Sequence, residues 1–143
     1  MKSTVIMLLI VMAFTLKAQT DSVNVNISIT GFENTKGLCR LLVFDQPKGF
    51  PEGRYDAIIV KSYKIIAGKL DIELKLKSGQ YAFSILHDEN SNEELDRAWY
   101  GKPKEGFGIS RNPKIYFTNP DFEDAEVPVN EKNKEFLIKM LYM

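Results

Sequence analysis

The alternation of apolar and polar residues with a period of two constrains this chain more than any other feature of its sequence. Between residues 23 and 30, four β-branched apolar residues alternate with Asn, Ser and Thr side chains. Residues 69–77 repeat the pattern, with apolar side chains at the even positions and charged side chains at the odd ones. Successive side chains of a strand point to opposite faces, so this period predicts strands with one buried and one solvated face.

Further strands are expected where the same period is shorter or less regular. Residues 38–44 place Cys39, Leu41 and Val43 on one face and Arg40 on the opposite face. Gly and Ser residues between such segments predict the turns that connect the strands. The other expected strands span residues 58–66, 81–87, 125–129 and 135–142.

The number and length of these segments predict the fold class. About seven short strands with polar turns between them, and no helical period, favour an all-β fold: a single antiparallel β-sandwich with one long loop at residues 88–114. Pro128 restricts the strand at 125–129 to a sheet edge, because proline cannot donate a ladder hydrogen bond. A small closed barrel is the alternative. No linker or repeat divides the chain, so residues 19–143 are expected to form one domain.

The first 18 residues have the composition of a secretory signal peptide. Lys2 precedes an apolar run that ends at Leu16, and Ala18 is the small residue expected before a cleavage site. The run is too short to cross a bilayer comfortably, and polar residues follow it. We therefore expect residues 1–18 to be removed and the domain to be secreted or periplasmic, with no transmembrane span. An uncleaved membrane anchor is the alternative.

Charge and cysteine content exclude several classes of function. Lys plus Arg and Asp plus Glu each number 19, and no basic cluster is present, so nucleic acid is not an expected partner. The single cysteine cannot form an internal disulfide, and one cysteine with one histidine cannot build a Cys/His zinc site. Cys39 is in phase with Leu41 and Val43, so it is expected to be a small buried apolar residue.

The stretch at residues 88–114 shows no sustained alternation and is expected to be one long loop. Loops of this length in compact domains are usually functional or disordered, and aromatic residues are not typical of disorder. Its first part carries oxygen-bearing side chains at every second position, which is the spacing of a calcium loop. The predicted Ca²⁺ ligands are Asp88, Asn90, Asn92 and Asp96 through their side chains and Glu94 through its backbone carbonyl.

Two positions depart from the calcium loop of helix–loop–helix proteins. Glu93 stands at the sixth position, where glycine is typical, and Trp99 stands at the twelfth, where a bidentate Glu is typical. We therefore expect a shorter calcium loop on a β scaffold, with a further carboxylate from elsewhere in the chain. A solvated polar turn, whose Asp and Asn side chains bond their own backbone, is the alternative. The candidates for the further carboxylate are Glu105, Asp121, Glu123 and Asp124.

His87 and three aromatic residues are the other candidates for a functional role. His87, the only histidine, is in strand phase with Phe83, and its simplest interpretation is a half-buried strand-end histidine bonded to a carbonyl group. A metal ligand or a general base is the alternative. No Gly-x-Ser-x-Gly turn supplies a nucleophile for hydrolysis. Trp99, Tyr100 and Phe107 could form a stacking platform for a sugar or peptide, or fold inward as a small core.

Two motifs of the loop carry a resemblance to a known family. They are His-Asp-x-Asn-x-Asn followed by Leu-Asp within residues 87–96, and Pro-x-Glu-Gly at residues 103–106. Over about residues 23–142 the chain resembles the bacterial family catalogued as domain of unknown function 2141. The resemblance implies a small exported β-sandwich protein of the immunoglobulin/transthyretin-like kind and no particular activity. The family pattern has glycine where this chain has Ser91 and Glu93, and positive φ is costlier there without glycine.

These observations favour a non-catalytic binding module. In this interpretation calcium orders the loop at residues 88–114, which presents a recognition surface for a glycan, a peptide or a protein of the bacterial envelope. The alternative is a periplasmic hydrolase that uses His87 with Asp88 or Glu105 as acid/base groups. A purely structural envelope protein is the third possibility.

Overall fold

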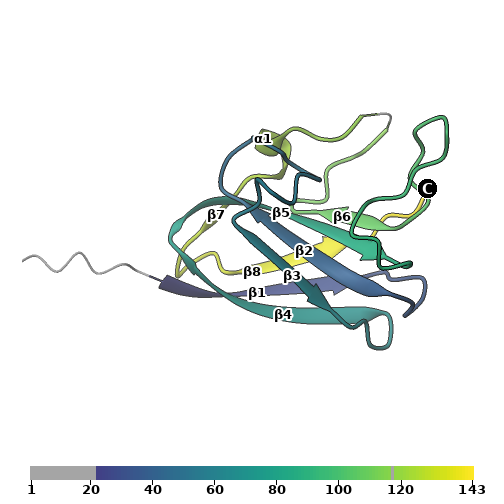
Figure 1. The fold of residues 1–143 in the computed structure, drawn as a ribbon. Coiled ribbons are helices and arrows are strands. Elements are labelled where there is room, and N and C mark those ends of the chain that lie inside the picture. Colours follow the sequence, from purple (N-terminus) through teal and green to yellow (C-terminus); the bar gives the residue numbers. More distant parts are fainter. Residues whose placement is uncertain (1–21, 117) are drawn as a thin grey trace, which may run out of the picture.

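The computed structural model describes residues 22–116 and 118–143, and the expected signal peptide at residues 1–18 lies outside this part of the chain. The described residues form eight strands and one short helix. The strands make two stacked sheets, one of three strands and one of five (Figure 1). The predicted all-β sandwich is therefore confirmed, with eight strands in place of about seven. Within the described ranges no helix has the length and apolarity needed to cross a membrane.

The three-stranded sheet has the order β4–β1–β8 and contains the two most regular alternating segments. β1 (Ser22–Thr30) pairs along its whole length with β4 (Lys69–Lys77) in antiparallel register. β8 (Glu135–Lys139) lies on the other side of β1 and runs parallel to it. The predicted antiparallel sandwich therefore contains one parallel pair, β1 with β8. The chain reaches β8 from β7, which is paired with β5 of the other sheet.

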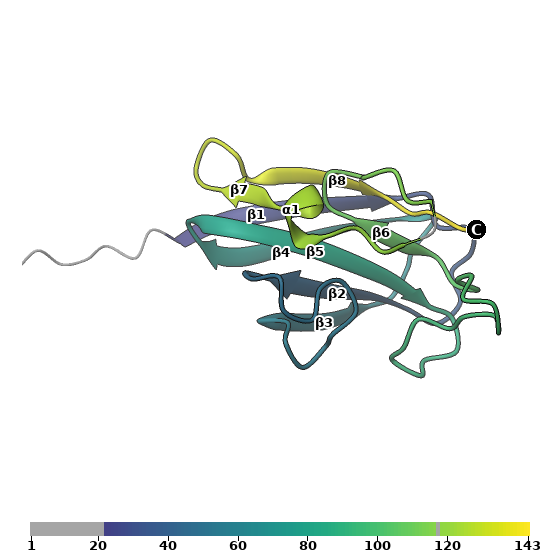
Figure 2. The same ribbon diagram turned by 90° about the horizontal axis from the view of Figure 1, so that it is seen from above.

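The five-stranded sheet is antiparallel throughout and has the order β3–β2–β5–β6, with β7 paired to the beginning of β5. Among the described strands β7 pairs only with β5, which agrees with the edge position predicted from Pro128. Seen from above in Figure 2, the loop that follows β5 lies at the same end of the molecule as the C-terminus. The strands are β3 (Ile59–Tyr63), β2 (Leu38–Phe44), β5 (Gly79–Asp88), β6 (Phe107–Ile109) and β7 (Val127–Val129).

The main core lies between the two sheets and consists of the alternate residues that the sequence pattern predicted. The four β-branched residues of β1 are fully buried, and so are Cys39, Leu41 and Val43 of β2. Phe83 and Ile85 of β5 belong to the same core. Burying an apolar side chain of this size contributes about 1.5–3 kcal/mol to the free energy of unfolding. The register is therefore strongly specified, since a slip of one residue would move a whole row of these side chains into water.

A second apolar cluster lies on the outer face of the five-stranded sheet, where the sequence pattern predicted none. Leu42 and Phe44 of β2 are buried there beside Ala82 of β5. The helix α1 (Phe122–Ala125) covers them with the side chain of Phe122. β2 and β5 are thus buried on both faces, which explains why their sequences are nearly continuous apolar runs.

Two elements are too short for their sequence periods to be visible. β6 lies within the predicted loop at residues 88–114, and its three residues cannot show an alternation. Its central Gly108 is needed for close packing, because a Cβ there would lie 2.8 Å from Cγ2 of Ile138. The four-residue helix α1 ends at Ala125, the first residue of the strand predicted at 125–129, so that strand begins two residues later than expected.

Candidate functional site

A pocket of about 890 Å³ lies on the outer face of the five-stranded sheet. Eight side chains form its floor in two rows, and each row crosses the strands β3, β2, β5 and β6 in turn. Five of these side chains are apolar, and three are polar. The first row is Ser62, Arg40, Leu86 and Phe107, and the second is Val60, Leu42, Ser84 and Ile109.

Three loops form the walls of this pocket. They are residues 45–58, residues 89–106, and residues 110–116 with 118–121. In Figure 1 these loops lie on the side of β2 and β5 that faces away from β1 and β4. Polar contacts join the loops, since Glu52 of the first accepts hydrogen bonds from Arg97 of the second and, at 2.9 Å, from Asn119 of the third. Arg54 and Glu93 form an ion pair between the first and second loops.

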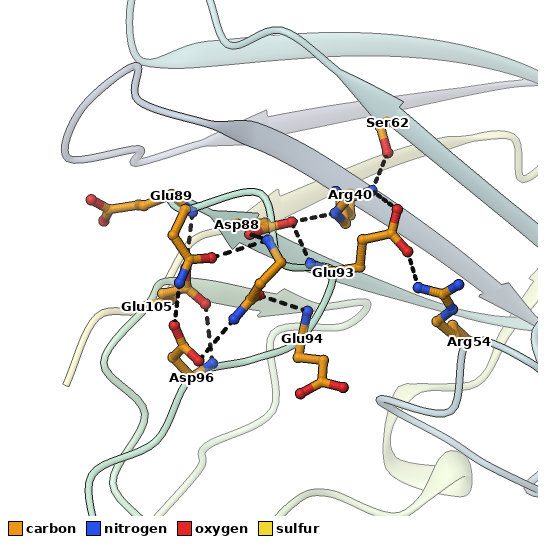
Figure 3. A network of polar contacts seen from close by, with 11 residues as sticks. Arg40, Arg54, Ser62, Asp88, Glu89, Glu93, Glu94, Asp96 and Glu105 are labelled. Atoms are coloured by element: carbon orange, nitrogen blue, oxygen red, sulfur yellow. Dashed lines mark hydrogen bonds and ion pairs between the residues drawn. The ribbon is translucent and has the colours of Figure 1, made fainter.

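Arg40 is the charged residue of the floor, and only 8% of its surface is exposed. Its Nε donates a hydrogen bond to Oδ2 of Asp88 at 2.5 Å, and its Nη1 donates to Oγ of Ser62 at 2.8 Å (Figure 3). Nη1 also lies 3.5 Å from Oε1 of Glu93. A buried guanidinium is stable only when its charge is compensated, and here two carboxylates compensate it.

Asp88 organises the loop that follows β5, and its side chain is fully buried. In addition to Arg40, its carboxylate accepts hydrogen bonds from the backbone N–H groups of Asn92 and Glu93, each at 3.0 Å. These contacts bend the loop back over the end of β5. The first predicted calcium ligand is therefore already engaged by an arginine and two backbone amides.

Asp96 joins the other predicted ligands. Its carboxylate accepts hydrogen bonds from the side-chain amides of Asn90 at 2.5 Å and Asn92 at 3.0 Å. Behind it, the buried Glu105 accepts hydrogen bonds from two backbone N–H groups of the loop at 2.9 and 3.1 Å. Glu94, whose predicted role used only its backbone carbonyl, has an exposed side chain that points away from this cluster (Figure 3). The structure thus joins the side chains of Asn90, Asn92 and Asp96 directly, and Asp88 is linked to them through the backbone N–H of Asn92.

The backbone of this loop is strained at the two positions where the family pattern has glycine. The φ angle is 61° at Ser91 and 70° at Glu93, in the left-handed region that costs non-glycine residues energy. Among the described residues, no three His, Cys, Asp or Glu side chains form a group that could hold a metal ion. A calcium ion in this loop would therefore depend on amide and backbone oxygens in addition to Asp88 and Asp96.

His87 is fully buried in the core, on the face of β5 opposite the pocket. Its Nε2 donates a hydrogen bond to the carbonyl of Lys36 at 2.8 Å, which leaves Nδ1 to accept one from the Tyr142 hydroxyl at 2.6 Å. The Tyr142 hydroxyl in turn accepts the backbone N–H of Glu33 at 3.2 Å, and burial raises the pKa of this phenol, which keeps it a donor. The predicted hydrogen bond to a carbonyl group is therefore present, but the ring is fully buried and not half-buried as expected, because Phe32 and Tyr142 pack against it.

The aromatic residues of the long loop do not form one unit. Trp99 is 96% exposed and Tyr100 is 63% exposed, and their rings meet edge to face with centroids 5.3 Å apart. They stand at the tip of a short turn closed by backbone hydrogen bonds at Ala98. Phe107 is instead buried in the pocket floor. The loop therefore carries an exposed pair of rings, and its third ring belongs to the sheet.

Sequence reasoning missed the residues of the pocket floor, although a signal for them was present. In β2 and β5 the positions out of phase with the core, such as Leu42, Phe44 and Ala82, are also apolar. An apolar outer face indicates that something covers it. The polar wall contacts had no comparable signal, since Glu52 and Arg97 are 45 residues apart in the chain.

Comparison with known protein families identifies a match to this chain. Over residues 27–136 the chain matches the family described as "Uncharacterized protein conserved in bacteria (DUF2141)". No curated protein and no solved structure matches the chain. The matched region runs from β1 into β8, so it contains both sheets and the pocket floor. On this match, and as its loop motifs predicted, the chain belongs to the bacterial family DUF2141.

Proposed function

We propose that this protein is a non-catalytic binding module, exported from a bacterial cell, that takes a small ligand into the pocket on the outer face of the five-stranded sheet. The observation that carries the proposal is the pocket itself, a cavity of about 890 Å³ with a mostly apolar floor and a few polar groups. Ligand sites typically have volumes of about 300–1,000 Å³ and this mixture of lining groups. Export rests on the sequence of residues 1–18.

The walls of the pocket support this proposal because they are held in place before a ligand binds. Glu52 joins all three covering loops through its contacts with Arg97 and Asn119. Arg54 and Glu93 add an ion pair between two of the loops. A site whose loops are already fixed loses less conformational entropy on binding than one that must order them.

Hydrolysis by His87 has less support than binding. The histidine lies in the core between the sheets, and both of its ring nitrogens are hydrogen-bonded within the protein. The described residues that line the pocket include neither His nor Cys, and Arg40, Arg54 and Arg97 each pair with a carboxylate. A general base must reach the substrate, and His87 does not reach this pocket.

The binding of calcium by the Asp88–Asp96 loop is a separate part of the proposal. Asp88, Asn90, Asn92 and Asp96 lie within one hydrogen-bonded cluster, and carboxylate and amide oxygens are the ligands that Ca²⁺ prefers. The loop is also a wall of the pocket through Glu93 and Glu94. Calcium bound there would stiffen the wall on which ligand binding depends.

Thermal unfolding tests the calcium part. We expect the midpoint for residues 19–143 to rise by roughly 5–10 °C when excess EDTA is replaced by Ca²⁺ at about 100 times its dissociation constant, with Mg²⁺ as the control. An Asp96→Asn variant should lose most of this shift. If millimolar Ca²⁺ produces no shift, the loop is the solvated polar turn that the sequence left as the alternative.

An uncharged apolar dye tests the pocket itself. We expect N-phenyl-1-naphthylamine to bind the protein saturably, with a rise in fluorescence. Val60→Lys puts a charge on the pocket floor, where Val60 is 45% exposed, and should weaken binding by about tenfold or more. Leu137→Lys is the matched control, because Leu137 is 51% exposed on the outer face of the other sheet. Equal binding by the two variants would contradict the proposal, and so would a wild-type protein that does not bind the dye.

A further inference from the structure

The pocket floor contains one buried hydroxyl group that has no hydrogen-bond partner among the described residues. Ser84 lies in the second row of the floor, between Leu42 and Ile109, and only 7% of its surface is exposed. Its Oγ forms no hydrogen bond with any described residue. Every side-chain N or O atom in the described part of the chain that is shut off from solvent has a partner, so the Ser84 hydroxyl must open into the pocket. A hydroxyl on an apolar surface gains free energy when a ligand supplies a hydrogen bond.

Arg40 supplies a second polar point on the same floor. Its Nε and Nη1 donate to Asp88 and Ser62, whereas its Nη2 donates to no described residue. No side-chain nitrogen of the described residues is both inaccessible to solvent and without a hydrogen-bond partner. Nη2 has no partner, so it is accessible to solvent, and its N–H groups face the pocket that Arg40 lines. The contact with Asp88 fixes the plane of the guanidinium, so the two remaining donors are held in one orientation. A ligand oxygen that accepts a hydrogen bond would satisfy them.

The charges of the pocket indicate what kind of oxygen this is. Arg40 is compensated by Asp88 and Glu93, and Glu93 also pairs with Arg54. The remaining arginine of the lining, Arg97, pairs with Glu52. Each arginine among the described lining residues thus pairs with a carboxylate. An anionic ligand would lie close to these carboxylates and be repelled by them. A neutral acceptor, such as a carbonyl or hydroxyl oxygen, meets the same donors without this repulsion.

We infer that the pocket selects uncharged, largely apolar molecules that carry a carbonyl or hydroxyl oxygen, with Arg40 and Ser84 binding that oxygen. This inference rests on the proposed function, since it names the chemical class of the ligand. The apolar body of the ligand would lie across Leu42, Val60, Leu86 and Phe107, which cross the sheet beside the two polar groups.

Paired fluorescent probes test the inference. Prodan is uncharged and apolar and carries a ketone, and 2-(dimethylamino)-6-propylnaphthalene has the same ring system and side-chain length with a methylene group in place of the ketone. We expect the wild-type protein to bind prodan about tenfold more tightly than its ketone-free analogue, which is the effect of one hydrogen bond to a charged donor. We also expect 8-anilinonaphthalene-1-sulfonate, an anion of similar size, to bind more weakly than prodan.

Two variants locate the effect on the floor. Ser84→Ala should reduce the preference for prodan over its analogue at least threefold and leave binding of the analogue unchanged. Ser28→Ala, on the outer face of the other sheet, is the matched control and should leave the preference intact. Arg40→Lys keeps a cation beside Asp88 but removes the forked donors, so it should also reduce the preference. Circular dichroism and urea unfolding would establish that each variant is folded.

The outcomes separate this inference from the proposed function. If both naphthalene probes bind equally, and Val60→Lys weakens both, the pocket binds ligands but does not select an oxygen, and only the inference is wrong. Tighter binding of the anionic probe than of prodan would also overturn it, because the charge argument would fail. If neither naphthalene probe binds, the inference and the proposed function are both wrong.

Discussion

The outer faces of the two sheets differ in composition although the sheets share one core. On the three-stranded sheet most outer residues, such as Asn26, Asp71 and Glu73, are polar and exposed to solvent, and the apolar Leu137 is exposed beside them. On the five-stranded sheet the outer residues Leu42 and Phe44 are buried under loops and a helix. Strict alternation therefore marks a face that is open to water, and its failure marks a face that something covers. In this molecule the pocket lies where the alternation fails.

The covered face also contains buried charged groups, whereas charged groups on the open face stay in water and lose little hydration free energy. Arg40 and Asp88 are both buried, whereas Asp71 on the open face accepts its hydrogen bond from Ser28 in an exposed position. An ion pair in water contributes little to stability, but a buried pair is costly to break because one charge then remains without its partner. The two faces should consequently respond very differently to loss of a carboxylate.

The largest effect is expected for Asp88→Ala. Removal of this carboxylate leaves the Arg40 guanidinium buried without its closest anion and two backbone N–H groups without an acceptor. We expect the free energy of unfolding to fall by about 4 kcal/mol, measured by urea denaturation at pH 7. Asp71→Ala on the open face is the control and should cost less than about 1 kcal/mol. Similar losses in both variants would show that Asp88 is not a structural centre of the covered face.

A somewhat smaller effect is expected for Phe44→Ala. Phe44 lies on the outer side of β2, is fully buried, and packs edge to face against Phe50 with ring centroids 5.4 Å apart. Truncation leaves a cavity, and we expect a loss of about 3 kcal/mol in the same measurement. Lys75→Ala, on the outer face of β4, should change the free energy of unfolding by less than about 0.5 kcal/mol. If Phe44→Ala is equally mild, the outer cluster does not behave as a second core.

A stabilisation is expected for Ser91→Gly. Ser91 has a φ of 61°, so glycine should relieve backbone strain and raise the free energy of unfolding by roughly 0.5–1 kcal/mol. Ser91→Ala is the control, because it removes the same hydroxyl and keeps the Cβ that is strained at this φ. The two variants should differ in sign or by several tenths of a kcal/mol. Equal stabilities would mean that the loop relaxes around residue 91 without cost.

The sandwich could be predicted because β1 and β4 alternate without interruption, and their observed bounds follow the pattern closely. The phase of the pattern also placed Cys39 in the core and Arg40 on the opposite face. Alternation reports only whether a residue points inward or outward. The apolar outward positions Leu42 and Phe44 of β2 indicate that this face is covered, but they do not indicate what covers it, because the cover comes from residues far along the chain.

The candidate site could be predicted only in its local part. The close spacing of Asp88, Asn90, Asn92 and Asp96 indicated a local polar cluster. The side chains of the last three are hydrogen-bonded to one another, and Asp88 joins them through the backbone N–H of Asn92. The partner of Asp88 is Arg40, which is 48 residues away and is reached through the β2–β5 pairing. A pair of this kind follows from strand register, which periodicity alone does not determine. The arrangement of the pocket floor in two rows depends on the register of four strands, so the apolar outward positions alone could not predict it.

The smallest effect is expected for the thiol of Cys39, which lies next to Arg40 in the chain but faces the opposite side of β2. Cys39 is fully buried, and burial raises the pKa of its thiol to about 12. Because the thiolate is the reactive form, we expect almost no reaction of the folded protein with Ellman's reagent at pH 8. Val60→Cys puts a second thiol on the pocket floor and should give one rapidly reacting thiol per chain.

The same raised pKa predicts how the stability of the protein changes with pH. The unfolded chain loses the Cys39 proton near pH 9, whereas the folded chain keeps it to about pH 12. The unfolded state therefore binds fewer protons in this range, so the contribution of Cys39 is fully present below pH 9 and declines between pH 9 and 12. Urea unfolding of wild type and Cys39→Ala from pH 7 to 10.5 measures this decline as a difference between the two proteins.

In the experiment with Ellman's reagent, a wild-type thiol that reacts as fast as the thiol of Val60→Cys would show that the core face of β2 opens as readily as its pocket face. The contrast between the two faces of this sheet would then fail at its centre.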